Sequence, residues 1–215
     1  MKDVTYKQLS LAEMEEIEAL QEIVIHSLED STILQPLSRA EFENILRDNG
    51  VMLGAFHDAQ LIGCRALLKP DPTEDEHLGV DAGADDLSRV LYQEVSFVHP
   101  TYRGYGLQRK LGERVMELVN LADFDFVCAT VKPFNIASLK DKFSQGMLVV
   151  ALKKKYGGKL RYVFAKRLHE HVKFKEDEIV INMGNIEEQQ KFIAQGYIGE
   201  QLIQTEDSWA VIYKK

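Results

Sequence analysis

The sequence has few of the features that mark secreted, membrane-spanning or disulfide-linked proteins. Only two cysteines occur among its 215 residues, Cys64 and Cys128. Each lies in an apolar run typical of a strand, so we expect buried reduced thiols and no disulfide framework. The opening stretch MKDVTYKQLS has no apolar segment of the kind a signal peptide carries, and no run approaches the roughly 18 to 20 apolar residues of a membrane span. These absences predict a cytoplasmic protein without a membrane partner.

Positive charge is also scarce. Lys and Arg total 26 against 34 Asp and Glu, which gives a net charge of −8. This balance opposes non-specific attraction to nucleic acid, so no nucleic-acid partner is predicted. The stretch from Asp71 to Asp86 contains seven acids and no Lys or Arg. We interpret it as a solvated loop.

Motifs for metal binding and nucleophilic catalysis are missing as well. His169 and His171 do not have the spacing of the zinc motif H-E-x-x-H, because Lys173 stands at the required place. No metal is therefore predicted. There is no G-x-S-x-G elbow, and neither cysteine has an activating neighbour in the sequence.

Hydrophobic periodicity and capping signals give the order of elements. Ser10 with Glu13, and Ser38 with Glu41, fit the capping box that begins a helix. After an initial strand we predict helices at 11–28, 39–48, 107–118, 135–145 and 186–195, and strands at 51–58, 60–70, 91–100, 124–133, 147–156, 159–168, 178–183 and in two further runs up to the end.

This order of elements predicts one main domain with a small addition. We place the main domain at residues 1–168 and an appended module of strand, helix and two strands at residues 169–215. Gly157 and Gly158 are expected to supply the positive φ angles of a type I′ hairpin turn. No internal repeat is apparent.

The stretch HPTYRGYGLQRKL, from His99 to Leu111, places basic side chains where a strand gives way to a helix. A helix start carries a partial positive charge, so cations are unfavourable there unless an anion binds. Gly104 and Gly106 allow close backbone approach, and free amides at a helix start bind phosphate oxygens. The spacing is neither a P-loop nor G-x-G-x-x-G. On spacing alone, an ordinary strand-to-helix turn remains an alternative.

In its context this stretch resembles the coenzyme motif [QR]-x-x-G-x-[GA] of the GNAT superfamily of acyl-CoA-dependent N-acyltransferases. Arg103 and Gly106 match the first and fourth positions, whereas Gln108 replaces the usual small residue. The stretch NIASLKDKFSQGM is similar to a second family motif, through Asn135, Ser138 and Gly146. The resemblance covers about residues 4–168. It implies an α/β fold with a mixed, mostly antiparallel central sheet flanked by helices.

The resemblance also implies acetyl-CoA as co-substrate. The pyrophosphate would lie on the amides from Gly104 to Arg109, and the pantetheine arm would run along the strand that precedes them. A main-chain amide there would polarise the thioester carbonyl. The implied coenzyme contacts are Ser96, Phe97, Val98, Arg103, Gly104, Tyr105, Gly106, Leu107, Gln108, Arg109, Asn135 and Ser138.

For the proton transfers, the resemblance implies a carboxylate base at Glu94, at the beginning of the motif strand; an exposed strand glutamate without a role is the alternative. Many relatives place a tyrosine acid seven residues after the motif asparagine, but here that position is Lys142. We interpret Lys142 as a solvated helix residue and Phe143 as core. The departing thiolate would then take its proton from water, from a tyrosine elsewhere, or after release.

Together these features predict an N-acetyltransferase that transfers acetyl from acetyl-CoA to an amine by direct attack in a ternary complex. A small-molecule amine is favoured over a protein acceptor. The alternative is a non-catalytic acyl-CoA-binding or regulatory module. A homodimer and the role of residues 169–215 are left open.

Overall fold

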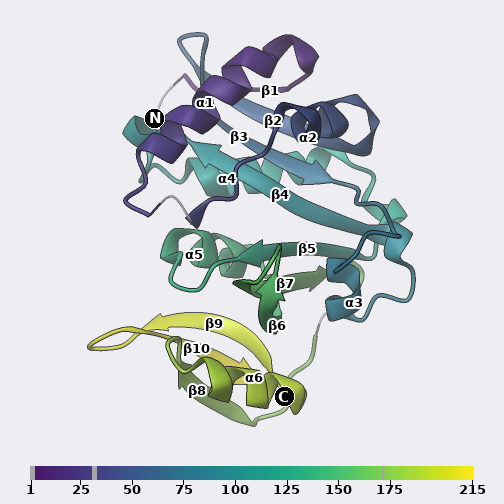
Figure 1. The fold of residues 1–215 in the computed structure, drawn as a ribbon, viewed down its shortest axis with the longest axis vertical. Coiled ribbons are helices and arrows are strands. Elements are labelled where there is room, and N and C mark those ends of the chain that lie inside the picture. The colour runs from purple at the N-terminus through teal and green to yellow at the C-terminus, as the bar shows by residue number, and fades with distance from the viewer. Residues whose placement is uncertain (1–2, 31–32, 171) are drawn as a thin grey trace. The chain divides into compact units, whose positions relative to one another are not determined.

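The computed structural model describes residues 3–30, 33–170 and 172–215 (Figure 1). Its fold divides into two units. The first consists of residues 1–70 and 91–121, and the second of residues 71–90 and 122–215. The segment 169–215 thus shares a unit with the strands that precede it.

Four antiparallel strands form the sheet of the first unit, in the order β1-β2-β3-β4. These strands are β1 (Thr5–Gln8), β2 (Gly50–His57), β3 (Gln60–Leu68) and β4 (Val90–Val98). Its helices are α1 (Met14–His26), α2 (Arg39–Asn44) and α4 (Leu107–Val115). Shorter helical turns lie at Leu11–Glu13, Ile45–Asn49, Pro100–Tyr102 and Met116–Leu118.

Both predicted capping boxes are present. The Ser10 and Ser38 hydroxyls each accept a backbone N–H of the following turn, and Glu13 and Glu41 accept the backbone N–H of those serines in return. The second helix is shorter than the predicted 39–48, because α2 ends at Asn44 and the chain continues as a π-helical turn.

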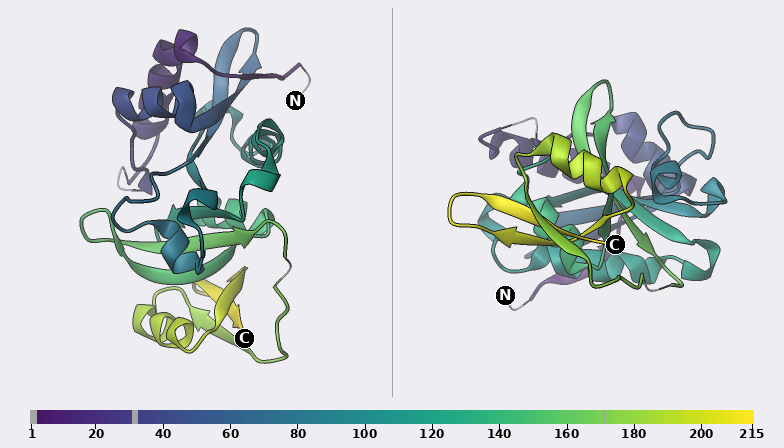
Figure 2. Two further views of the ribbon diagram at one scale, coloured as in Figure 1. Left: turned by 90° about the vertical axis from the view of Figure 1, so that its right-hand side faces the viewer. Right: turned by 90° about the horizontal axis from the view of Figure 1, so that it is seen from below.

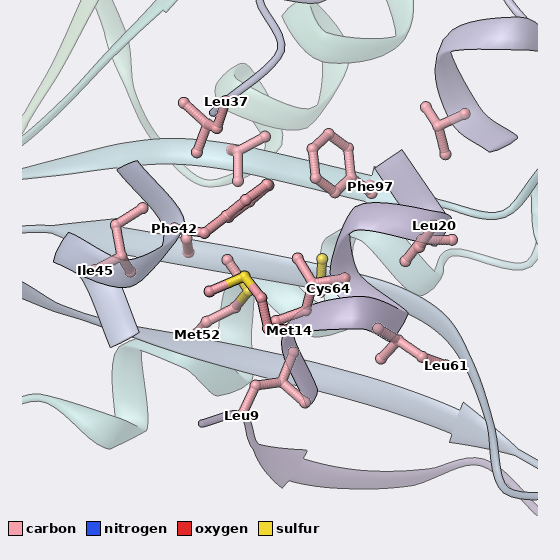
Figure 3. Close-up of a cluster of buried hydrophobic side chains, with 14 residues drawn as sticks. Leu9, Met14, Leu20, Leu37, Phe42, Ile45, Met52, Leu61, Cys64 and Phe97 are labelled. Carbon is pink, nitrogen blue, oxygen red and sulfur yellow. The ribbon is translucent and has the colours of Figure 1, made fainter. Parts of the chain in front are cut away.

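The core of the first unit lies between its sheet and helices α1 and α2 (Figure 3). The apolar stripe of α1 is buried, as its three-and-four spacing predicts. It packs on strand residues from β2, β3 and β4. The labelled members of this cluster are Leu9, Met14, Leu20, Leu37, Phe42, Ile45, Met52, Leu61, Cys64 and Phe97.

Six strands form the sheet of the second unit, in the order β5-β7-β6-β9-β10-β8. They are β5 (Phe126–Val131), β6 (Leu148–Lys155), β7 (Lys159–Arg167), β8 (Glu178–Asn182), β9 (Ile198–Gln204) and β10 (Trp209–Lys214). The helices are α3 (Leu78–Ala82), α5 (Ile136–Ser144) and α6 (Ile186–Ala194), with 3-10 turns at Leu87–Arg89 and Leu121–Asp123.

The second unit contains an internal repeat, which corrects the expectation that none exists. The elements β5-α5-β6-β7 recur in the same order as β8-α6-β9-β10, with both helices nine residues long. The strand order β5-β7-β6 of the first copy is mirrored by β9-β10-β8 of the second. Figure 2 shows α6, in yellow-green, lying along the hairpin of β9 and β10. The segment 169–215 therefore holds a second copy of the preceding strand-helix-hairpin.

The two copies meet where β6 pairs with β9. In this pairing Val149 lies opposite Gly199. A Cβ atom at Gly199 would lie 2.8 Å from the Val149 Cβ, so only glycine lets the strands come this close. In addition α5 contacts β9 and α6 contacts β6, so each helix packs on a strand of the other copy.

The acidic stretch from Asp71 to Asp86 is only partly the solvated loop predicted for it. It contains the short helix α3, and residues 77–79, at the beginning of that helix, are buried. The Asp81 carboxylate forms ion pairs with Lys153 and Lys155 of β6, whose charges draw this part of the loop onto the sheet. The other six acids of the stretch are exposed.

The remaining expectations for local structure are met with one change. Cys64 and Cys128 are free and buried, and burial raises the pKa of both thiols to about 12. The β6–β7 turn has three residues with positive φ, Tyr156, Gly157 and Gly158, instead of the two of a type I′ turn. Within the described ranges, none of the helices is long and apolar enough to cross a membrane.

Candidate active site: an uncapped helix start and a strand bulge

The glycine junction forms an open turn at the start of α4. Gly104 has φ +83° and Gly106 has φ +70°, conformations that side chains rarely adopt. A Cβ atom at either position would meet nothing within 4 Å. Glycine is therefore required here by the left-handed backbone conformation, and not by a lack of space for a side chain.

The start of α4 has no side-chain cap. That of α1 has none either, but α1 continues a 3-10 turn that Ser10 caps. The N-cap of α4 is Gly106, and no acid lies in its first turn. By contrast, Ser38, His77, Asn135 and Asn185 accept backbone N–H groups at the starts of α2, α3, α5 and α6. The first amides of α4 therefore keep their capacity to bind an anion.

The cations of this turn are placed around it in different ways. Arg103 donates from Nη2 to the Ser27 hydroxyl at 2.7 Å, which ties the turn to the end of α1. Arg109 lies one helical turn from Glu113, with 3.6 Å between its Nε and the carboxylate. Lys110 and Tyr105 are exposed, Tyr105 to 60 %.

Glu94 occupies a β-bulge inside β4. In the register of β3 and β4, Ala66 pairs with Val95 and Leu67 pairs with Gln93, so Glu94 is the extra residue. Glu94 therefore lies in the middle of β4 and not at its beginning. A bulge bends its strand, leaves one residue outside the ladder and re-aims a side chain, and bulges are common beside active sites.

The strand residues expected along the pantetheine arm point to different faces. Phe97 is fully buried in the α1–α2 core, so its side chain cannot contact a coenzyme and only its backbone is available. Ser96 and Val98 alternate with it and point to the other face. The Ser96 hydroxyl is buried and, among the described residues, has no hydrogen-bond partner. The backbone of Ser96, like that of Phe97, is the part of the residue that a ligand could use.

In the second unit, capping brings Asn135 and Ser138 together. The Asn135 side chain accepts the Ser138 N–H at 3.3 Å. The second copy repeats this cap with Asn185, whose amide also donates to the Glu188 carboxylate at 2.6 Å. An acid therefore covers the start of α6, whereas the first turn of α5 contains none. Of the two starts, that of α5 is better suited to an additional ligand contact.

Lys142 is not the solvated residue that the sequence predicted. Only 7 % of its surface is exposed. Its ammonium lies 3.5 Å from the carboxylate of Asp141, which is also buried. The error has a physical reason: α5 is enclosed on more than one face, so a lysine off the apolar stripe is buried too. Phe143, predicted as core, is half-buried and forms a T-shaped ring pair with Phe164.

The second unit also presents a tyrosine that the sequence did not single out. Tyr156 follows β6, has φ +51° and is 46 % exposed. Its hydroxyl accepts a hydrogen bond from the Thr130 hydroxyl of β5 at 3.3 Å. The only sequence signal for it is its place before the two glycines of the hairpin.

A metal centre was not predicted, and the structure points to a different use of His169. Its Nε2 lies 2.8 Å from the Phe124 carbonyl oxygen, a contact within the loop around β5. Its neighbour His171 is outside the described residues. Among the residues that are described, no three His, Cys, Asp or Glu side chains gather as metal ligands.

Comparison with known proteins gives matches in structure alone. No family model and no curated protein matches the sequence. A putative acetyltransferase from Salmonella typhimurium, solved with acetyl-CoA, is 17% identical with a TM-score of 0.58; the match covers 82% of this chain and 100% of that one. NAA60 from Arabidopsis thaliana, solved with a bisubstrate analogue, is 16% identical with a TM-score of 0.60, covering 78% and 99%.

A third match is the NatC complex bound to Gag peptide and CoA, at 17% identity and a TM-score of 0.58, covering 77% of this chain and 99% of that chain. Further matches include an acetyltransferase of the GNAT family from Streptococcus pneumoniae. All of these proteins are matched over nearly their whole length. The chain has the mixed, mostly antiparallel α/β fold of the GNAT acetyltransferases.

Proposed function

We propose that this protein is an N-acetyltransferase that transfers the acetyl group of acetyl-CoA to an amine by direct attack in a ternary complex. The observation that carries the proposal is the uncapped start of α4 at Gly106. In a chain of net charge −8, this is a local anion site made of backbone amides. The fold of the matched acetyltransferases, some of them solved with acetyl-CoA or CoA, supports the same reading.

The residues fit a pyrophosphate and a pantetheine arm. The amides from Gly104 to Arg109 would hold the pyrophosphate, with Lys110 adding charge at the rim. The arm would run along the backbone of Ser96, Phe97 and Val98. Asn135 and Ser138 would contact the arm from the start of α5. When bound, the coenzyme supplies an acetyl thioester.

The chain's own groups would move the protons. An amine acceptor is an ammonium near neutral pH and must lose a proton before it attacks, since its pKa is about 10. Glu94, set outside the ladder by the bulge, would accept that proton directly or through one water. A main-chain amide of β4 would polarise the thioester carbonyl. Water would return a proton to the thiolate, or the thiolate would take one up after release.

The acceptor that we propose is a small cationic amine. Six of the seven acids between Asp71 and Asp86 are exposed and give the second unit a negative surface segment. Such a segment raises the encounter rate of a cation in a salt-sensitive way. A peptide is the competing acceptor, because the matched NatC complex was solved with a Gag peptide.

The test is turnover of acetyl-CoA by the full chain, measured as thiol release against two panels of acceptors. One panel holds polyamines and other small amines, and the other holds peptides with free N-termini. Turnover with small amines supports both parts of the proposal, whereas turnover with peptides alone overturns the choice of acceptor. Tight binding of acetyl-CoA without turnover on either panel identifies a binding module, and absence of binding overturns the coenzyme site.

A further inference from the structure

Arg65 is a fully buried arginine at an unusual place in the first unit. It lies in β3, has 0 % of its surface exposed and pairs in register with Ser96 of β4. Its neighbour Cys64 points into the α1–α2 core, so Arg65 points to the opposite face of the sheet. That face is covered by α4, as the position of Gly63 shows: a Cβ there would lie 3.2 Å from the Leu107 side chain.

The guanidinium of Arg65 joins the two elements that make up the candidate site. Its Nη2 donates to the Gln93 side-chain oxygen at 2.5 Å, and its Nη1 donates to the Gln108 carbonyl at 3.3 Å. Gln93 is the residue before the bulged Glu94, on the far side of the bulge from Ser96. Gln108 is the second residue of α4, within its uncapped first turn.

An arginine is not needed at this position to fill space. Buried ionic groups are often replaced by apolar residues of similar volume without loss of stability, so burial alone does not account for the choice. The guanidinium does two things that an apolar residue cannot. Its rigid fork fixes two acceptors at once, and its permanent charge adds positive potential beneath a helix start that has no acid of its own.

We propose that Arg65 is a positioning residue that holds two features in a fixed relation: the Glu94 bulge and the turn from Gly104 to Arg109, called the coenzyme turn below. The proposal rests on the proposed function for its effect on catalysis. Its structural part stands without that function, because the two hydrogen bonds fix Gln93 and Gln108 in the chain as it is. Arg65 itself acts through these two residues and contacts neither substrate nor coenzyme.

The experiment compares Arg65→Met, Gln93→Met and Cys64→Ala with the unaltered full chain. Cys64→Ala is the matched control, since it alters the adjacent buried residue on the other face of the same strand. Amide hydrogen exchange of the ligand-free protein is measured first. Arg65→Met should speed exchange at least tenfold in both 110–113, where the bonded amides of α4 begin, and 92–96. Gln93→Met should do so only in 92–96, and Cys64→Ala in neither segment.

Coenzyme binding and turnover are measured next, with CoA in a calorimeter and acetyl-CoA with an accepted amine. Arg65→Met should raise the Kd for CoA at least tenfold, equal to about 1.4 kcal/mol, and should also lower kcat. Gln93→Met should lower kcat and leave the Kd within twofold. If Arg65→Met fails to fold, Arg65→Lys replaces it, because lysine keeps the charge and loses the fork.

The outcomes separate this inference from the proposed function. Unchanged exchange in both segments of a folded Arg65 variant overturns the positioning role, whatever the unaltered protein binds. Faster exchange in both segments supports it even if the unaltered protein binds no CoA, in which case the proposed function fails alone. If Cys64→Ala speeds exchange in these segments as much as Arg65→Met does, any buried residue of β3 would have the same effect, and the inference is overturned.

Discussion

Asn135 and Asn185 begin two nine-residue helices, fifty positions apart, with nearly the same backbone conformation. Asn135 has φ −75° and ψ 73°, and Asn185 has φ −86° and ψ 74°. Each helix is followed by a left-handed glycine, Gly146 or Gly196, that leads into a strand. The same cap, helix and exit turn are thus built twice, and only the first copy resembles the family motif in its sequence.

One buried position distinguishes the two copies. Leu139 of α5 and Gln189 of α6 are equivalent, and both are completely buried. Gln189 accepts the hydroxyls of Tyr162 and Tyr213 at 2.7 and 2.9 Å and donates to the Met183 carbonyl at 2.9 Å. Burial raises the pKa of both tyrosines. A polar centre therefore replaces an apolar contact in the second copy.

We predict that Gln189→Leu destabilises the protein by about 2–4 kcal/mol, since buried groups that lose their partners each cost about 1–3 kcal/mol. Tyr213→Phe alone should cost about 1 kcal/mol, because Gln189 keeps its other partners. Urea unfolding of the three proteins measures both values. Adding Tyr162→Phe and Tyr213→Phe to the Gln189 variant should restore part of the lost stability. Equal costs for Gln189→Leu and Tyr213→Phe would contradict the view that Gln189 joins several hydrogen bonds at one point.

The sequence predicted the elements well, because their signals are local. Capping boxes at Ser10 and Ser38 and the spacing of apolar residues need no knowledge of the neighbours in space. The repeat was missed although Asn-Ile and Gln-Gly recur at an offset of fifty, in NIASLKDKFSQGM and NIEEQQKFIAQGY. Between these points the helix residues differ so much that only the backbone shows the equivalence.

The burial of charged residues was also not predicted from the sequence. Lys142 and Asp81 look like surface residues in the sequence, and the structure buries both side chains beside partners of opposite charge. The bulge at Glu94 and the contacts of Arg65 depend on the pairing of β3 with β4, which no local pattern contains. The sequence therefore located the glycine turn at the start of α4, whose binding of coenzyme stays a prediction, and it gave no sign of the Arg65 contacts with Gln93 and Gln108.

The coenzyme turn is tested by Gly106→Val with Gly83→Val as its matched control. Both glycines have φ near +70° and open space around a Cβ, so both changes strain the backbone to a similar extent. Only Gly106 lies at the start of α4. We expect the Kd for CoA to rise at least tenfold with Gly106→Val, about 1.4 kcal/mol, and to stay within twofold with Gly83→Val. Titration calorimetry distinguishes the two, and equal Kd values would place the pyrophosphate elsewhere.

Asp81 pairs with one buried and one exposed lysine, and we expect the buried pair to contribute far more to stability. Lys155 is buried, bonds the Asp81 carboxylate at 2.9 Å and donates to the Glu76 carbonyl at 2.6 Å, whereas the Lys153 side chain is 47 % exposed. Asp81→Asn leaves the Lys155 charge unpaired and should cost about 3–5 kcal/mol. Lys153→Met should cost at most about 1 kcal/mol. Urea unfolding at pH 7 compares them, and similar losses would show that Lys155 does not depend on Asp81.

His77 predicts a pH dependence of stability. Burial lowers its pKa below the usual 6.5, with Lys155 contributing and Glu74 opposing, and its Nδ1 accepts the Gly79 N–H at 3.0 Å. As the pH falls below 6.5, His77 takes up a proton in the unfolded chain but stays neutral in the folded chain. The free energy of unfolding therefore decreases, with a slope of up to about 1.4 kcal/mol per pH unit. The contribution is complete above pH 6.5 and is lost toward the lowered pKa.

The measurement for His77 is the free energy of unfolding between pH 7.5 and 5.5. His77→Asn keeps an acceptor for the Gly79 N–H and removes the titrating group, so its stability should fall less steeply over this window. Parallel curves for the two proteins would mean that other groups cause the loss of stability.

Proton transfer is tested by Glu94→Gln, which keeps the shape of the side chain and removes its basicity. We expect turnover to fall by roughly 10² to 10⁴, the usual contribution of a positioned general base. The Kd for CoA should stay within twofold, since the bulge itself is kept. The pH profile of kcat should lose the ascending limb that belongs to the carboxylate and keep only the deprotonation of the amine. Glu117→Gln, at an exposed carboxylate after α4, is the control and should change neither quantity. A Glu94→Gln enzyme that retains full turnover would assign the base to another group, and the bulge would then serve the backbone amide of β4 alone.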